Sequence, residues 1–200
     1  EKAEAAVSFT TGMAEITDTM FALLSPGDRV VSVKDTYGGT NRLFLDILPR
    51  FGIEVMLCET HDHAQIEAEI SKGCTLLYLE TPTNPTMKLN DINRLATAAH
   101  NVGALVVVDN TVATPINQKP ITLGADLVVH SATKYLGGHA DALGGILCGS
   151  KELINKVYEY RMITGSPLDP NAAYSLIRGM KTLEIRIERQ NKNALEVAKY

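Results

Sequence analysis

The 200-residue chain has few cysteines, no long apolar run and no excess of basic residues. Its three cysteines are odd in number and far apart, so neither a disulfide framework nor a zinc site is expected. We expect them to be small hydrophobic side chains in a reducing cytoplasm. The longest apolar runs, such as 104–108, are too short to cross a bilayer, and no secretory signal is visible. A net charge of -4 gives no indication of binding to nucleic acid or to an anionic membrane.

Nucleotide-binding and metal-binding motifs are missing as well. The glycine-rich stretch 137–145 does not follow the G-x-G-x-x-G pattern, and there is no P-loop. We expect this stretch to let the chain turn back after Lys134. The five histidines show no metal-ligand spacing, so no metal site is predicted.

What the sequence does contain is an alternation of short apolar runs with longer helical patterns. Such alternation predicts an α/β fold with a mostly parallel sheet covered by helices on both faces. Seven strands are expected, at Ala6–Phe9, Arg29–Val33, Ile53–Cys58, Thr75–Glu80, Leu105–Asp109, Leu127–His130 and Gly145–Cys148. Four helices are expected between them, at Gly12–Leu24, Thr40–Arg50, His63–Ser71 and Asp91–Asn101.

Both ends of the sequence suggest a segment of a longer protein. The sequence starts without methionine in the helix-like run Glu1–Ala6, is helical from Lys151 onward, and ends inside the uncapped helical pattern Leu183–Tyr200. Two hundred residues are enough for one domain with a sizeable core.

Polar and reactive residues follow several of the expected strands. In open α/β sheets, ligands bind beyond the carboxyl ends of the strands, so these residues are expected to share one edge. The segments at that edge are Thr10–Met13, Thr36–Gly39, Thr81–Pro85, Asp109–Thr111 and His130–Tyr135.

Asp109 ends the most apolar strand and is expected to be nearly buried. A buried carboxylate is costly unless it meets a positive partner. The protonated nitrogen of a pyridine ring is such a partner, as in pyridoxal enzymes. The alternative, an aspartate that caps the following turn, is equally compatible with the sequence.

Lys134 follows a buried strand by four residues, among small and hydroxyl-bearing neighbours. A lysine attacks an aldehyde only in its neutral form, which desolvation or a nearby positive charge favours. Its position therefore makes Lys134 the candidate nucleophile, whereas an arbitrary lysine is a solvated surface group.

Ser131 and Thr133 carry hydroxyls able to donate to a phosphate. Gly12 and Met13 open a helix, where free N–H groups and the positive dipole end favour an anion. Gly12 also permits close approach of the backbone. Ordinary helix capping by the two preceding threonines is the alternative.

Tyr37 precedes two glycines that leave space beside its ring, where a planar cofactor could stack. Asn84 lies between two prolines, in a stiff loop that presents one amide. Without a ligand, both residues would be ordinary turn residues.

These segments together resemble the Cys/Met-metabolism, or trans-sulfuration, family of pyridoxal 5′-phosphate (PLP) enzymes. The resemblance runs along essentially the whole chain and is most specific at Ser131–His139. Supporting segments are Thr11–Met13, Tyr37–Thr40, Glu80–Pro85, Val108–Thr111 and Arg178–Leu183. The family includes cystathionine γ-synthase, cystathionine γ-lyase, methionine γ-lyase and O-acylhomoserine sulfhydrylase.

The resemblance implies a fold-type-I, PLP-dependent transferase-like large domain with a seven-stranded sheet over residues 1–200. It also implies that an N-terminal arm and a C-terminal small domain are absent from the sequence. In the family, parts of these regions complete the site from a neighbouring subunit and bind the substrate carboxylate. The expected assembly is a homotetramer, a dimer of dimers with shared active sites.

Residue roles follow from the same resemblance. Lys134 is implied to hold PLP through a Schiff base and Asp109 to pair with the ring nitrogen. Tyr37 is implied to stack on the ring and to act as an acid–base, and Asn84 to lie near the phenolic oxygen. The implied phosphate-binding residues are Gly12, Met13, Ser131 and Thr133.

The implied small-molecule substrate is a sulfur amino acid or O-acylhomoserine, and the implied reaction takes place at its γ-carbon. The tyrosine loop favours a cystathionine γ-synthase or γ-lyase, because methionine γ-lyases usually carry a cysteine where this chain has Gly39. Methionine γ-lyase and O-acylhomoserine sulfhydrylase activities stay open. So do another fold-type-I enzyme, such as an aminotransferase or cysteine desulfurase, and a non-catalytic relative.

Overall fold

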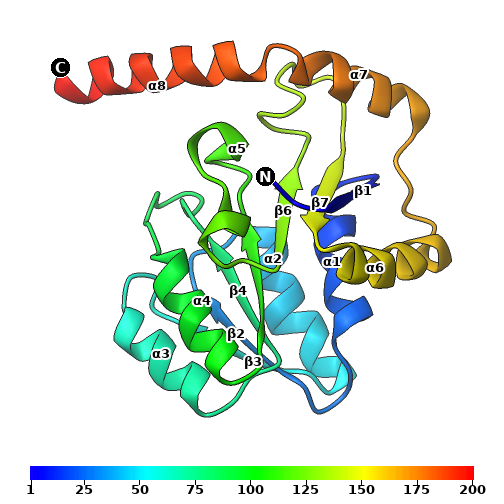
Figure 1. The fold of residues 1–200 in the computed structure, drawn as a ribbon, viewed down its shortest axis with the longest axis vertical. Coiled ribbons are helices and arrows are strands. Elements are labelled where there is room, and N and C mark those ends of the chain that lie inside the picture. Colours follow the sequence, from blue (N-terminus) through cyan, green and yellow to red (C-terminus); the bar gives the residue numbers. More distant parts are fainter.

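The computed structural model describes all residues from Glu1 to Tyr200. One seven-stranded sheet forms the centre of the molecule, with strand order β1-β7-β6-β5-β4-β2-β3 (Figure 1). The strands are β1 (Ala5–Phe9), β2 (Arg29–Val33), β3 (Glu54–Cys58), β4 (Leu76–Glu80), β5 (Leu105–Asp109), β6 (Leu127–Ser131) and β7 (Gly145–Gly149). All seven predicted strands are therefore present, with ends within one residue of the prediction.

The sheet is parallel from β3 through β2, β4 and β5 to β6. Strand β7 runs antiparallel to β6, which confirms that the glycine-rich stretch turns the chain back after Lys134. Strand β1 is antiparallel to β7 and so runs in the same direction as β6. The predicted mostly parallel sheet is confirmed, and six strands end at one edge.

Helices cover both faces of the sheet. One apolar core lies under α1 (Gly12–Leu23) and α6 (Lys151–Thr164), and the other under α3 (His63–Ser71) and α4 (Ile92–Asn101). The short helices α5 (Thr114–Asn117) and Pro120–Leu123 connect β5 to β6. This three-layer arrangement explains why the central strands are apolar on both faces.

The predicted helix Thr40–Arg50 is wrong as a single regular helix. The chain instead forms α2 (Gly38–Arg42), a π-helical turn (Leu43–Ile47) and a 3₁₀ turn (Leu48–Phe51). Pro49 has no backbone N–H and its ring clashes with the carbonyl four residues earlier, so a regular helix cannot continue through it.

The helical reading of Glu1–Ala6 is also wrong, because β1 begins at Ala5. Ala5 and Ala6 lie opposite Gly149 and Cys148 of β7, so pairing along the sheet overrides the local preference of the alanines.

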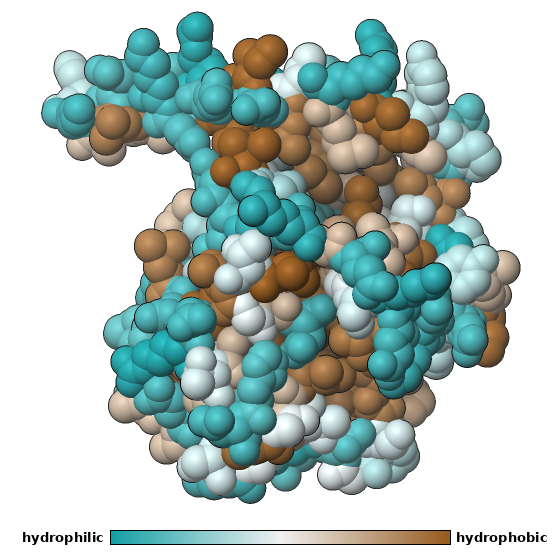
Figure 2. Space-filling model, viewed as in Figure 1, coloured by the Kyte–Doolittle hydropathy of each residue, from teal (hydrophilic) through white to brown (hydrophobic).

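The helical region after Lys151 is confirmed as α6, α7 (Pro170–Met180) and α8 (Leu183–Lys199). Helix α6 packs on α1 and β1, whereas α8 extends away from the body of the molecule (Figure 1). Large apolar side chains are exposed on α7 and α8; they are Tyr174, Ile177, Met180, Ile185, Leu195 and Val197. Figure 2 shows apolar surface at the upper end of the view, where these two helices lie. No helix in the structure is both long and apolar enough to span a bilayer.

The three cysteines form no disulfide. Cys58 is buried, and Cys74 and Cys148 are half-buried. Burial raises the pKa of the Cys58 thiol to about 11 and that of Cys148 to about 12. Because the thiolate is the reactive form, these cysteines are packing residues rather than nucleophiles.

Candidate active site

The carboxyl ends of the strands bring the expected site segments together. Asp109 at the end of β5 lies opposite Glu80 of β4 on one side and Val129 of β6 on the other. Ser131, two residues after Val129, pairs with Gly145 of β7, which in turn pairs with Phe9 of β1. The segment Thr10–Met13 thus starts at the same edge as Asp109 and Lys134.

Asp109 is buried, as expected, and no cation contacts it. Its Oδ1 accepts a hydrogen bond from the backbone N–H of Thr111 (2.9 Å), and its Oδ2 lies 3.4 Å from the Tyr78 hydroxyl. Burial raises the pKa of this carboxyl, and the contacts with Thr111 work in the opposite direction. One oxygen therefore forms the local turn contact, while the other has only a long hydrogen bond and could accept a cationic donor.

Lys134 lies in a turn just beyond the end of β6. Its backbone N–H donates to the Ser131 carbonyl (3.0 Å) and its carbonyl accepts from Gly138 (2.7 Å), which fixes the turn. The side chain is exposed, so the expected desolvation is not provided by this chain, because the turn projects past the sheet. No carboxylate pairs with the amine, which is therefore available to a ligand.

Gly12 and Ser131 touch where α1 begins. A Cβ on Gly12 would come within 2.9 Å of Ser131 Cβ and 3.0 Å of its Oγ, so only glycine fits this position. Thr11 caps α1 by accepting from Ala14 N–H (3.0 Å), as the capping alternative predicts. Capping leaves the N–H groups of Gly12 and Met13 at the positive end of the helix, so capping and anion binding are compatible.

Thr133 is placed less favourably for a phosphate. Its Oγ1 accepts from Gly144 N–H (3.0 Å) and lies 3.3 Å from the Gly144 carbonyl. The hydroxyl therefore closes the loop before β7, and an anion would have to compete with Gly144 for its proton. Sequence reasoning could not find this competition, since it depends on the return of the chain after Lys134.

Tyr37 and Asn84 reach the same edge from separate loops. The Tyr37 side chain is 48% exposed, and Asn84 is also exposed, so both are accessible to a ligand. Their backbone N–H groups donate to one carboxylate, with Tyr37 N–H bound to Glu80 Oε2 (2.8 Å) and Asn84 N–H to Glu80 Oε1 (2.9 Å).

Sequence reasoning missed two buried carboxylates at this edge, Glu80 and Glu15. Burial, and secondly the charge of Asp109, raise the pKa of Glu80 to about 7 and the pKa of Glu15 well above its ordinary range. Glu15 Oε1 accepts from His130 N–H (3.2 Å), whereas its Oε2 has no hydrogen-bond partner. Glu80 had a detectable signal, because it ends an apolar strand just as Asp109 does; Glu15 lies within the helical pattern of α1 and had none.

The residues of this edge fit a cofactor with a cationic ring and an anionic tail. Asp109, Glu80 and Glu15 are buried without a cationic partner, so a positive charge beside Asp109 is favoured. The start of α1, closely packed on Ser131, favours an anion. Lys134, whose amine forms no ion pair, follows β6, and β6 lies between β5 and the pair β7–β1 in the sheet.

Comparison with known proteins identifies a family that matches the whole chain. The sequence profile described as "Cys/Met metabolism PLP-dependent enzyme" matches residues 1–200. The chain belongs to this family. Three predictions made from the sequence are thereby confirmed: membership of this family, PLP as the cofactor of the family, and the fold-type-I architecture.

Relatives within the Cys/Met-metabolism family carry different activities. An L-methionine gamma-lyase of Fusobacterium nucleatum subsp. polymorphum is 45% identical over 203 residues, covering 100% of this chain and 51% of the relative. A cystathionine gamma-lyase of Bacillus subtilis (strain 168) is 44% identical over 201 residues, covering 100% of this chain and 53% of the relative. The chain therefore spans about half the length of these relatives.

A solved structure supports the same fold. The crystal structure of cystathionine gamma-lyase from Lactobacillus plantarum, complexed with L-serine, superposes with a TM-score of 0.94 at 40% sequence identity. The match covers 99% of this chain and 52% of that chain.

Proposed function

We propose that the full-length protein is a PLP-dependent trans-sulfuration enzyme acting at the γ-carbon of sulfur amino acids or O-acylhomoserine. A cystathionine γ-synthase or γ-lyase type of activity is favoured. The observation that carries the proposal is the shared edge, where the buried carboxylate of Asp109 and the unpaired amine of Lys134 follow adjacent parallel strands. Opposite ends of one planar cofactor require such a pair.

Each candidate residue has a defined task in this proposal. Bound PLP supplies a ring that accepts electrons from the substrate α-carbon. Lys134 would hold the cofactor through its Nζ. Once the substrate amine has replaced it there, the freed Nζ would take a proton from the α-carbon and deliver it to a neighbouring carbon. Asp109 would keep a proton on the ring nitrogen through Oδ2, the oxygen that has only the long hydrogen bond from Tyr78. Tyr37 covers the ring and moves a proton at its phenolic oxygen.

The remaining candidates bind and orient. The backbone N–H groups of Gly12 and Met13 and the Ser131 hydroxyl hold the phosphate, with Thr133 contributing when it releases the Gly144 carbonyl. Asn84 would present its side-chain amide to the phenolic oxygen of the cofactor. Together these contacts fix the ring relative to Lys134, which is the main requirement for directed proton transfer.

Methionine γ-lyase activity is the second candidate, because the relative from Fusobacterium nucleatum carries that name. Gly39, beside the Tyr37 ring, argues against it, since methionine γ-lyases usually have a cysteine there. The reaction products decide between the two activities.

The proposal also covers the assembly, the extent of the domain and the location of the protein. Residues 1–200 would form the PLP-binding large domain of a longer chain, within a cytoplasmic homotetramer whose subunits share active sites. The chain covers about half of each relative, which supports the proposal that it is one domain of a longer protein. The unpaired cysteines suit a reducing compartment.

The test uses the purified full-length protein with cystathionine, with methionine, and with O-acetylhomoserine plus cysteine. Ketoacid, ammonia and thioether are measured for each. We expect products from cystathionine or from O-acetylhomoserine plus cysteine. The visible band of bound cofactor should disappear in Lys134→Ala and persist in Lys192→Ala, a matched change on exposed α8. Transfer of the amino group alone, without γ-substitution or elimination, would overturn the proposal.

A further inference from the structure

Glu80 occupies an unusual position at the end of β4. The side chain is 3% exposed, lies opposite Asp109 in the register of the sheet, and forms no ion pair. Carboxylates are rarely buried without a cation, because the loss of hydration is costly. A specific set of hydrogen bonds must therefore offset this cost.

The partners of Glu80 are two backbone N–H groups that are distant in the sequence. Oε2 accepts from Tyr37, in the loop that follows β2, and Oε1 accepts from Asn84, in the loop that follows β4. Both oxygens are used, one for each loop. One side chain thus sets the separation of two backbones that carry the exposed side chains Tyr37 and Asn84.

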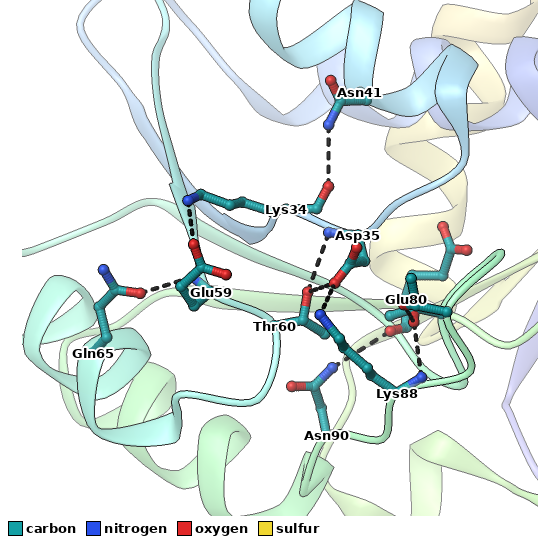
Figure 3. A network of polar contacts seen from close by, with 11 residues as sticks. Lys34, Asp35, Asn41, Glu59, Thr60, Gln65, Glu80, Lys88 and Asn90 are labelled. Carbon is teal, nitrogen blue, oxygen red and sulfur yellow. Dashed lines mark hydrogen bonds and ion pairs between the residues drawn. The ribbon is translucent and has the colours of Figure 1, made fainter.

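A second contact joins the same two loops. Lys88 Nζ donates to Asp35 Oδ2 (2.8 Å), which also accepts from the Thr60 hydroxyl (2.6 Å), as Figure 3 shows. This ion pair is partly exposed, with 35% of the Lys88 side chain accessible, and pairs of this kind contribute little. The bonds to Glu80 involve a buried side chain, are charge-assisted when it is ionised, and are the stronger connection.

We propose that Glu80 is a positioning residue, whose ionised carboxylate holds Tyr37 and Asn84 at a fixed separation across the cofactor without itself contacting it. This inference rests on the proposed function for the roles of those two side chains. A carboxylate suits the task because both of its oxygens are acceptors, whereas a glutamine has one acceptor and one donor.

The ionisation of Glu80 is sensitive to its surroundings. The acidic groups that face it are Asp109 on β5, Asp35 after β2 and Tyr78 on its own strand; the nearest cation in the network is Lys88. Burial and Asp109 raise the pKa of Glu80 to about 7, and the N–H groups of Tyr37 and Asn84 act in the opposite direction. Both acceptor oxygens are therefore available mainly above neutral pH.

The first experiment measures amide hydrogen exchange in the cofactor-free full-length protein. It therefore tests the hydrogen bonds from Glu80 to the two loops independently of any catalytic activity. In Glu80→Gln, peptides containing Tyr37 or Asn84 should exchange on the order of tenfold faster in at least one of the two loops. The matched control is Asp126→Asn, which neutralises the carboxylate that accepts from Val106 N–H (2.7 Å) at the opposite end of the sheet. It should leave both loops unchanged. Unchanged exchange of both loops in Glu80→Gln would overturn the proposal.

The second experiment loads the same variants with PLP. We expect Glu80→Gln to keep the cofactor on Lys134, to bind it about tenfold more weakly and to lose part of its visible circular dichroism. Glu80→Asp keeps two acceptor oxygens and should recover part of the signal. A full signal in Glu80→Gln would contradict the positioning role even if the enzyme proves to be of the proposed class.

If Glu80→Gln does not fold, the wild-type protein still decides the question. Protection of the two loops, corrected for intrinsic exchange, should be greater at pH 8 than at pH 6. Equal protection at both pH values would overturn the proposal.

Discussion

Gly39 lies between the side chains of Met13 and Tyr37. A Cβ at this position would lie 2.8 Å from Met13 Sδ and 2.8 Å from Tyr37 Cε1, which is closer than real Cβ contacts allow. Both atoms belong to movable side chains, so the backbone can stay in place while the Tyr37 ring turns away. The orientation of this ring therefore depends on the absence of a side chain at residue 39.

We expect Gly39→Ala to displace the Tyr37 ring while the fold is kept. In the PLP-loaded full-length protein, the visible circular dichroism should change and kcat should fall roughly tenfold, about 1.4 kcal/mol. The control is Gly38→Ala, whose Cβ meets nothing within 4 Å, and it should leave both values unchanged. Equal effects of the two substitutions would show that the ring is not held by this contact.

At the scale of elements, the turn that carries Lys134 is held by α8. Arg186 donates to the Tyr135 carbonyl (2.8 Å) and the Gly179 carbonyl (2.9 Å), and lies 3.4 Å from the Leu136 carbonyl. A Cβ on Gly179 would lie 2.0 Å from the Gly137 carbonyl oxygen, so α7 also packs directly on this turn. The helices after β7 therefore position a segment of the site, although they lie far from it in the sequence.

Arg186→Ala should loosen the turn after β6 because it leaves backbone carbonyls without donors. The loss is expected to be about 2 kcal/mol in local stability. Hydrogen exchange of residues 135–138 should accelerate, and PLP should dissociate faster. Arg189→Ala, an exposed arginine on the same helix, is the control. No change in exchange would mean that other contacts hold the turn.

At the scale of the whole molecule, one edge of the sheet concentrates three buried carboxyl groups. Glu15, Glu80 and Asp109 come from α1, β4 and β5, and burial raises the pKa of all three carboxyls. Ionisation of these groups lowers the stability of the cofactor-free protein, because each loses hydration and the charge of Asp109 repels Glu15 and Glu80. A cation beside Asp109 relieves this repulsion, so cofactor binding and stability should be linked.

We expect the free energy of unfolding of the cofactor-free full-length protein to fall as the pH rises from 5.5 to 8. The pKa of Glu80 is raised from 4.5 to about 7 in the folded state. The folded form thus holds the proton more tightly, and the resulting stabilisation, present below pH 4.5, is lost as the pH rises through 7. The contribution of the full shift is on the order of 3 kcal/mol.

Denaturant unfolding at several pH values measures this dependence. Glu80→Gln should flatten the curve around pH 7, and PLP should stabilise the wild type most at high pH. A free energy of unfolding that stays constant or rises between pH 5.5 and 8 would contradict a raised pKa of Glu80 in the folded protein.

The sequence by itself determined the strands, the parallel sheet and the edge at which the site lies. Local composition suffices here, because apolar runs buried on both faces and polar residues at their ends leave few other arrangements. It failed at Thr40–Arg50, where Pro49 breaks the helix, and at Glu1–Ala6, where pairing with β7 outweighs the preference of the alanines for a helix.

Only the tertiary structure decided which groups share a partner. The Thr133 hydroxyl is bound to Gly144, Lys134 is exposed, and Glu80 joins the loops of Tyr37 and Asn84. These contacts connect residues up to 43 positions apart, and side-chain hydrogen bonds of that separation leave no periodic trace in a sequence. Periodicity reports which face of an element is buried, whereas the partner of a buried charge depends on how the elements assemble.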